Sequence, residues 1–586
     1  MSQPLLAVHN LSIDFNQESD FVPAVKNISF DVAAGEILAI VGESGSGKSV
    51  TSLSLLQLLP KEASVKGQLL FSKDASKTIS LNSISEKEIN AIRGKKIAMI
   101  FQEPMTSLNP VFTCGYQVME AIQLHQQLSS PLAKAKTIAL FEKVKLPNPA
   151  EMMNRYPHQL SGGQKQRVMI AMAISCDPCL LIADEPTTAL DVTVQKTILE
   201  LVKELQLQSG MGVILITHDL GLVADIADRV LVMYKGEIVE QGNTKDVLQD
   251  PQHPYTKALL ECRPVMHRRG DRLPVVAPLP PKGGSETIRL EAVISHSEDI
   301  RSNAGVENQS LETETHNSEK IVLKVENLNV YFSGRKTLFG KTPAPFKAVD
   351  HVSFTVRKGE TVGLVGESGC GKTTLGRAIL QLIPASSGNI ILNGVNLAGL
   401  SKRAMKPVRK DLQIVFQDPY GSLNPRLTIG AAIQEPMKVH AILGSNIARK
   451  DKVMELLEKV NLSPEHFNRY PHQFSGGQRQ RICIARALAL NPSFLIFDES
   501  VSALDVSVQA QVLNLLNDLK KEFGFTAIFI SHDLSVVHFI SDRIIVMHQG
   551  EIIEEGPSDE IYFSPKNEYT KKLIAAIPGR GLMIGR

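Results

Sequence analysis

Two glycine-rich segments of this sequence have the residue types and spacing that bind phosphate groups. GESGSGKS spans Gly42 to Ser49, and GESGCGKT spans Gly366 to Thr373. Each follows a short apolar run and precedes a helical pattern, so backbone N–H groups can surround phosphate oxygens and the helix N-terminus adds positive potential. The pattern predicts one phosphate-binding loop in each half of the chain, built on Gly42, Gly45, Gly47, Gly366, Gly369 and Gly371.

The residues that close these loops predict a nucleotide with a bound Mg²⁺. Lys48 and Lys372 are expected to contact the β- and γ-phosphates. Hydroxyl and carboxylate oxygens are hard ligands of the kind that Mg²⁺ prefers, and an aspartate ends a later apolar run in each half. The expected Mg²⁺ ligands are Ser49, Asp184, Thr373 and Asp498.

A glutamate and a histidine add hydrolytic chemistry to each half. Glu185 and Glu499 directly follow the aspartates, where a carboxylate could polarise an attacking water as general base. His218 and His532 each end another apolar run, where a side chain could contact the γ-phosphate and position water. A histidine at a strand end usually has no such role, but here it recurs 33 residues after the glutamate in both halves. We therefore expect four catalytic residues.

A second anion-binding pattern, SGGQ, also occurs twice. A serine followed by two glycines opens a helix and presents free N–H groups. Because each half already has a phosphate loop, we expect this motif to cover the γ-phosphate held by the other half, with ATP between the two. The residues are Ser161, Gly162, Gly163, Gln164, Ser475, Gly476, Gly477 and Gln478.

These motifs belong to a sequence unit that occurs twice in the chain. Between Ser161 and His218, each motif residue recurs 314 residues later. The runs EILAIVG, CLLIADE and GVILITH predict buried parallel strands with the motifs at their carboxyl ends. Residues 103–160 and 418–474 have helical spacing. We expect an α/β core with an inserted helical subdomain in each half, with domains at 1–280 and 320–586 and a flexible acidic linker at 281–319.

Composition excludes several classes of protein. The 586 residues carry 63 basic and 61 acidic side chains, so no field of one sign draws the chain to nucleic acid. No apolar run approaches the length of a spanning helix, and the N-terminus lacks a signal-peptide pattern. The six cysteines are scattered, which favours a reducing, cytosolic compartment.

These segments resemble the nucleotide-binding domains of ATP-binding cassette (ABC) transporters, for which SGGQ before the acidic strand is highly specific. The resemblance covers nearly the whole chain except the linker, and it implies two tandem P-loop ABC ATPase domains with RecA-like cores and the cofactors ATP and Mg²⁺. It also implies Q-loop contacts to Mg²⁺ or water by Gln102 and Gln417, and D-loop aspartates at Asp191 and Asp505. Further ATP contacts would be made by Thr374 and, through adenine stacking, by Phe15 and Phe332, which could equally be core aromatics.

FQ[ED]P followed by SLNP, RYPHQ, and HPYTKALL at His253 to Leu260 are similar to the peptide-importer branch of the family. The tandem arrangement looks most like fused ATPases of glutathione importers, with microcin or oligopeptide importers close behind. This resemblance implies docking on two transmembrane permease subunits and an extracytoplasmic substrate-binding protein as a further partner. It places the chain peripherally, on the cytoplasmic face of a bacterial inner membrane.

Two other classes of protein are alternatives to a transport ATPase. A tandem ABC protein that acts on ribosomes or nucleic acid needs a basic, helical arm, whereas this linker is acidic. A regulator without a transport role would have eroded catalytic residues, and both halves keep theirs. The sequence leaves open the cargo (dipeptide, oligopeptide, glutathione, nickel or opine), the pairing of halves within or across chains, and a redox role for Cys370. Because Cys262 stands alone, no iron–sulfur cluster is expected.

Overall fold

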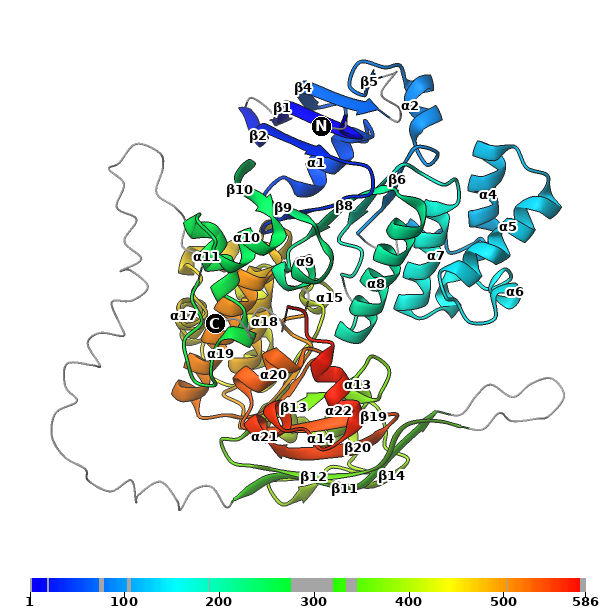
Figure 1. Ribbon diagram of the computed structural model, residues 1–586. Coiled ribbons are helices and arrows are strands. Elements are labelled where there is room, and N and C mark those ends of the chain that lie inside the picture. The colour runs from blue at the N-terminus through cyan, green and yellow to red at the C-terminus, as the bar shows by residue number, and fades with distance from the viewer. Residues whose placement is uncertain are drawn as a thin grey trace. The chain divides into compact units, whose positions relative to one another are not determined.

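The computed structural model describes residues 3–17, 20–72, 78–102, 107–188, 190–275, 320–332, 345–502 and 504–579. These residues form two compact units (Figure 1). The first contains the chain up to Leu260 together with the C-terminal residues from Pro578, and the second runs from Glu261 to Ile577. The linker expected at 281–319 lies outside the described residues.

A six-stranded sheet is the centre of the first unit, in the order β10-β9-β3-β8-β7-β6. Neighbours from β9 to β6 are parallel, and β10 pairs antiparallel with β9 at one edge. The strands are β3 (Ile37–Val41), β6 (Ile97–Ile100), β7 (Leu180–Asp184), β8 (Gly212–Thr217), β9 (Arg229–Tyr234) and β10 (Glu237–Asn243). The predicted strands are confirmed: they are β3, β7 and β8, and every residue in them is buried.

The sheet is buried on both faces because its side chains alternate between two cores. In β7, Leu180 and Ile182 belong to one core, whereas Leu181 and Ala183 belong to the other. A four-stranded antiparallel sheet, ordered β2-β1-β4-β5, contributes to the first core. Its strands are β1 (Leu6–Gln17), β2 (Asp20–Val32), β4 (Ala63–Ser72) and β5 (Thr78–Ser80). The sequence motifs did not predict this second sheet.

Helices supply the second core of the first unit. Within the range expected to hold a helical subdomain, α4, α5 and α6 lie together at one side, apart from β1, β2 and β4 (Figure 1). The helices are α1 (Lys48–Leu55), α2 (Glu86–Ile92), α4 (Cys114–Gln126), α5 (Ser130–Lys143), α6 (Pro149–Met152), α7 (Gly162–Ile174), α8 (Val192–Ser209), α9 (Leu220–Ile226), α10 (Thr244–Gln249) and α11 (Pro254–Glu261), with a 3-10 turn η1 (Pro157–Gln159).

The second unit repeats this architecture. Its central sheet has the equivalent order β16-β17-β18-β13-β19-β20, and its antiparallel sheet has the order β12-β11-β14-β15. The strands are β11 (Ile321–Phe332), β12 (Phe346–Arg357), β13 (Thr361–Val365), β14 (Ser387–Leu392), β15 (Val395–Asn396), β16 (Leu412–Val415), β17 (Phe494–Asp498), β18 (Thr526–Ile530), β19 (Arg543–His548) and β20 (Glu551–Pro557). The α/β fold class is therefore confirmed for both halves.

The helices of the second unit follow the same order. They are α13 (Lys372–Ile379), α14 (Lys402–Asp411), α15 (Pro419–Ser422), α16 (Ile429–Val439), α17 (Asn446–Lys459), α18 (Gly476–Leu488), α19 (Val506–Phe523), α20 (Leu534–Ile540), α21 (Ser558–Phe563) and α22 (Glu568–Ala575), with 3-10 turns η3 (Pro464–Asn468) and η4 (Pro471–Gln473). Across the described ranges, no helix has both the length and the apolar character needed to cross a membrane.

Residues 261–275, which the sequence placed in the first domain, fold with the second unit. Their 3-10 turn η2 (Pro264–Met266) packs against α20, and Leu273 is buried in the core of that unit. The backbone N–H of Leu273 donates to Asn514 Oδ1 at 3.0 Å, and Asn514 Nδ2 donates to the Leu273 carbonyl at 2.8 Å. These long-range contacts, rather than chain order, decide which unit the segment joins.

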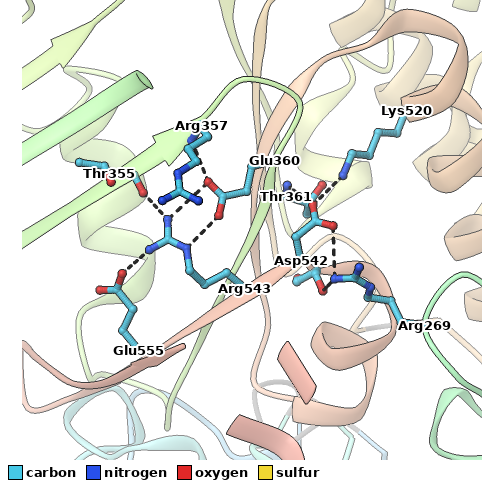
Figure 2. A network of polar contacts seen from close by, with 10 residues as sticks. Arg269, Thr355, Arg357, Glu360, Thr361, Lys520, Asp542, Arg543 and Glu555 are labelled. Atoms are coloured by element: carbon cyan, nitrogen blue, oxygen red, sulfur yellow. Dashed lines mark hydrogen bonds and ion pairs between the residues drawn. The ribbon is translucent and has the colours of Figure 1, made fainter. Parts of the chain in front are cut away.

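A charged contact reinforces the same attachment (Figure 2). Arg269 Nη1 lies 3.3 Å from Asp542 Oδ1, while Lys520 of α19 donates to Asp542 Oδ2 at 2.9 Å. Figure 2 shows Arg269 and Lys520 both pointing at this carboxylate. Asp542 also accepts the backbone N–H of Thr361, the first residue of β13, at 2.8 Å. The segment is thus joined to the strand that leads into the second phosphate loop.

Candidate functional site

The glycine-rich loops lie where the sequence predicted, between a buried strand and a helix. In the first unit β3 leads into the loop and α1 starts at Lys48; in the second, β13 leads into the loop and α13 starts at Lys372. Gly45 and Gly47 have φ of 79° and 99°, a left-handed backbone that strains other residues. A Cβ on Gly47 would also lie 2.6 Å from the Ala24 carbonyl oxygen. The loop therefore requires glycine for its curvature and for its close packing.

Both loop lysines are buried and folded back over their own loops. Lys48 Nζ donates to the carbonyl oxygens of Gly42 and Glu43 at 2.7 and 2.8 Å. Lys372 Nζ makes the same bonds to Gly366 and Glu367 at 2.7 and 3.0 Å. Each ammonium group is thereby held beside the loop amides, where the charge of a phosphate would be neutralised.

The predicted Mg²⁺ ligands meet in pairs. Ser49 Oγ donates to Asp184 Oδ1 at 3.0 Å, and Thr373 Oγ1 donates to Asp498 Oδ1 at 2.9 Å. Burial raises the pKa of Asp184 to about 6, and the charge of Glu185 adds to this, although the Ser49 hydroxyl and Lys48 act against it. Burial likewise raises the pKa of Asp498. A hydroxyl beside a buried, poorly compensated carboxylate fits the hard oxygen ligation of Mg²⁺.

The first candidate general base is held by three side chains. Glu185 Oε2 accepts from Gln102 Nε2 at 3.0 Å and from Thr188 Oγ1 at 2.8 Å, while His218 Nδ1 lies 3.4 Å from Oε1. Burial raises the pKa of Glu185, but His218, Thr188 and the charge of Lys48 outweigh it and lower the pKa to about 2. The carboxylate is therefore ionised in the nucleotide-free protein, where His218 and Thr188 stabilise the anion.

The second candidate general base has the same glutamine and histidine neighbours, but both lie at one carboxylate oxygen and the hydroxyl contact differs. Glu499 Oε2 accepts from Gln417 Nε2 at 2.9 Å and lies 3.6 Å from His532 Nδ1. Burial raises the pKa of Glu499, but His532 and Lys372 outweigh it, so the net shift is downward. Ser502, at the position of Thr188, donates instead to the backbone carbonyl of Glu499 at 2.9 Å.

Both glutamates have left-handed backbones, with φ of 46° at Glu185 and 47° at Glu499. Such a conformation is costly for a residue other than glycine and persists only when its surroundings impose it. The backbone N–H of each glutamate donates to the neighbouring strand, at Ile216 and Ile530. The sequence motifs predicted neither this strain nor the contact of Thr188; a hydroxyl three residues after the glutamate in both halves was the available signal.

The SGGQ motifs form the exposed starts of α7 and α18. Ser161 Oγ accepts the Gln164 N–H at 3.3 Å, and Gln164 Oε1 accepts the Ser161 N–H at 3.1 Å. Ser475 and Gln478 form the same capping box. The second glycine of each motif packs against the following helix: a Cβ on Gly163 would lie 2.7 Å from Val194. Each motif thus presents an ordered helix N-terminus to solvent.

The remaining predicted site residues are placed here by their position in the fold and their exposure. Asp191 and Asp505 precede α8 and α19, the positions expected of D-loop residues. Phe332 is 44% exposed at the end of β11, whereas Phe15 is partly buried against the first core. Thr374 follows Thr373 in the first turn of α13. Their roles toward ATP stay predictions.

Comparison with known proteins identifies the family. A profile described as "ABC transporter" matches residues 25–188 and 349–502, which contain both loops and both Asp-Glu pairs. The chain belongs to the ABC transporter family. A second profile, "Oligopeptide/dipeptide transporter, C-terminal region", matches residues 239–285 and 553–581. Together these matches make it an ABC ATPase that drives transport by hydrolysing ATP.

Relatives of this ABC ATPase match over nearly its whole length. It is 49% identical over 580 residues to the glutathione import ATP-binding protein GsiA of Salmonella choleraesuis, covering 98% of this chain and 90% of that protein. GsiA of Escherichia coli K12 is 49% identical over 577 residues, covering 98% and 89%. A solved dimeric bacterial ABC transporter cassette matches 41% of this chain and 98% of its own, with 27% identity and a TM-score of 0.37.

Proposed function

We propose that this chain energises the import of small peptides, with glutathione as the cargo. The observation that carries the proposal is 49% identity over 98% of the chain to glutathione import ATP-binding proteins. Two complete sets of loop lysine, Mg²⁺-ligand pair, glutamate and histidine support two competent ATP sites. A role on ribosomes or nucleic acid is not favoured, because both matching family profiles describe transporters.

The proposed chemistry gives each side chain a separate role. Lys48 and Lys372 exchange their loop carbonyls for the β- and γ-phosphates when ATP binds. Glu185 and Glu499 accept a proton from the attacking water, and His218 and His532 orient these carboxylates and contact the γ-phosphate. Mg²⁺, held by Ser49 with Asp184 and by Thr373 with Asp498, would neutralise the charge that develops on the phosphates. Gln102 and Gln417 hold the glutamates until the nucleotide arrives.

ATP binding would then close the two halves, each SGGQ motif covering the nucleotide held by the other half, and hydrolysis would reopen them. This cycle would drive permease subunits between two states. Two permeases and an extracytoplasmic binding protein are the proposed partners, with the chain on the cytoplasmic face of the inner membrane. Support comes from the importer relatives and from apolar side chains on the helical subdomain.

The first helical subdomain has such an apolar patch beside the start of α4. Val111 is 70% exposed, and the exposed rings of Phe112 and Tyr116 stack with centroids 5.0 Å apart. Exposed aromatic clusters of this kind often mark sites of protein–protein contact. We propose that this patch receives a cytoplasmic helix of one permease.

Purification of the tagged chain from native membranes in mild detergent tests the proposal. We expect two permeases and a binding protein to co-purify, and glutathione to raise ATP turnover of the complex. Phe112→Ser should lower permease recovery without changing basal ATP hydrolysis, whereas Lys48→Ala should weaken ATP binding itself. Recovery of ribosomes, or of no membrane protein, would overturn the transport role. Stimulation by other peptides but not by glutathione would overturn the cargo.

A further inference from the structure

The C-terminal region that follows β9 in the first unit, and β19 in the second, contacts the backbone of the phosphate loop. In the first unit, Tyr255 on α11 accepts a hydrogen bond from the backbone N–H of Glu43, with its hydroxyl oxygen 3.1 Å away. In the second unit, Tyr569 on α22 accepts from the Glu367 N–H at 3.0 Å. Glu43 and Glu367 are the second residues of the two loops, so the same contact occurs independently twice.

Each unit adds a second backbone contact on the same side of the loop. The turn between β9 and β10 places the Gly236 N–H 3.1 Å from the Ser46 carbonyl oxygen. The turn between β19 and β20 places the Gly550 N–H 3.0 Å from the Cys370 carbonyl oxygen. The C-terminal region of each half therefore holds the loop at one backbone N–H and one backbone carbonyl.

The tyrosines are themselves rigidly placed. Tyr255 is 2% exposed, and its ring packs against Tyr234 with centroids 4.3 Å apart. Tyr569 packs against His548 at 4.1 Å, at the equivalent position. A glutamate on the adjacent strand holds the turn before each helix: Glu240 accepts from the backbone of Gln252 and His253, and Glu554 accepts from Lys566 and Asn567.

We propose that Tyr255 and Tyr569 are positioning residues that hold each phosphate loop in its ATP-binding shape. The C-terminal region of each half then braces the loop from outside, through one tyrosine hydroxyl. This role rests on the proposed ATP sites, because the tyrosines act on those sites through the backbone of the loop. Loss of the hydroxyl leaves the Glu43 or Glu367 N–H without this acceptor and loosens the loop that must order around phosphate.

The test replaces each tyrosine by phenylalanine in the full chain, which keeps the ring packing. ATP hydrolysis is measured where one site remains active: Glu499→Gln leaves the first site, and Glu185→Gln leaves the second. We expect Tyr255→Phe to raise the KM for ATP about threefold or more at the first site, with a smaller change in kcat, and to leave the second site unchanged. Tyr569→Phe should give the mirror result. Tyr234→Phe removes a neighbouring hydroxyl and is the matched control.

Unchanged KM values for both variants would overturn the proposal. An equal rise at both sites, with a lower melting temperature, would overturn it in favour of a general folding role. Equilibrium ATP binding to the Glu185→Gln, Glu499→Gln double variant separates this test from the general-base assignment. If the single glutamate variants fail to silence their sites, the general-base assignment is wrong. Weaker ATP binding at one of the two sites in the Tyr255→Phe variant would still support the positioning role of Tyr255.

Discussion

The two ATP centres of this chain share a geometry but hold their glutamates differently. Glu185 accepts a hydrogen bond from the Thr188 hydroxyl on its carboxylate, whereas the Ser502 hydroxyl of the second centre bonds the backbone of Glu499. The glutamine and histidine distances agree to within 0.2 Å, although these side chains reach both oxygens of Glu185 and a single oxygen of Glu499. Thr188 and Ser502 differ by one methyl group, but the Thr188 hydroxyl orients a carboxylate whereas the Ser502 hydroxyl bonds the backbone.

A second difference lies between the same motifs. Pro186 follows the first glutamate, whereas Ser500 follows the second, is 3% exposed, and has a hydroxyl without a hydrogen-bond partner among the described residues. A buried hydroxyl without a partner costs free energy. The two centres therefore differ in the support of the residues around their glutamates, and we expect them to contribute unequally to ATP turnover.

Removal of the glutamates should have the largest effect. Glu185→Gln and Glu499→Gln should each keep ATP binding and lower turnover, with the larger loss from Glu185→Gln. The double variant should lose about 100-fold or more, since a positioned general base contributes about 10²–10⁴-fold. Phosphate release at saturating ATP measures the loss, and ATP retained through gel filtration measures trapping of the closed state. Normal hydrolysis by the double variant would refute the general-base assignment.

Removal of the buried aspartates should stabilise the nucleotide-free protein while it abolishes hydrolysis. Because the pKa of Asp184 is raised from 3.8 to about 6, its charge opposes folding above about pH 6, by at most about 3 kcal/mol. Asp184→Asn should therefore raise the Tm by several degrees at pH 8, and the gain should shrink as the pH falls from about 6 to about 4. Asp498→Asn should also raise the Tm at pH 8, because burial raises the pKa of Asp498 as well. An unchanged Tm at pH 8 would contradict the inferred burial cost.

Loss of the Thr188 hydroxyl should separate the two centres. Glu185 has a lowered pKa, so its contacts stabilise the fold above its ordinary pKa of 4.5 and lose effect as the pH falls toward 2. Thr188→Val should lower stability by about 1–2 kcal/mol at pH 7, and Ser502→Ala by about 0.5–1, because only the first bond reaches a charged acceptor. Thermal unfolding at pH 7 and pH 4 measures both. Equal losses for the two variants would remove the proposed asymmetry.

The smallest effect is expected at Ser500. Ser500→Ala removes a buried hydroxyl that has no partner among the described residues. The free energy of unfolding should therefore stay constant or rise by up to about 1 kcal/mol, and the Tm should stay constant or rise with it. The matched change in the same loop, Ser502→Ala, removes a bonded hydroxyl and should lower the Tm. A lower Tm for Ser500→Ala would show that this hydroxyl has a role the centre requires.

Sequence reasoning recovered the parts of this molecule in which chemistry and local structure coincide. The strands β3, β7 and β8 were predictable because each is a buried, mainly apolar run that leads directly into a functional motif. The antiparallel sheet was not predicted, since its strands end in no such motif. The Tyr255 contact joins residues 212 positions apart, and the Leu273 contact with Asn514 spans 241. Pairings at such distances depend on the assembled fold rather than on any local pattern.

The attachment of residues 261–275 to the second unit has a practical consequence for dividing the gene. A two-polypeptide version cut within 281–319 would leave this segment on the first product, where the Leu273 and Asn514 bonds become a specific contact with the second product. A cut after Leu260 would instead make this segment the N-terminal part of the second product. With the first cut, the two products bind each other through this segment. With the second cut, the segment folds within the second product and makes no contact between the products.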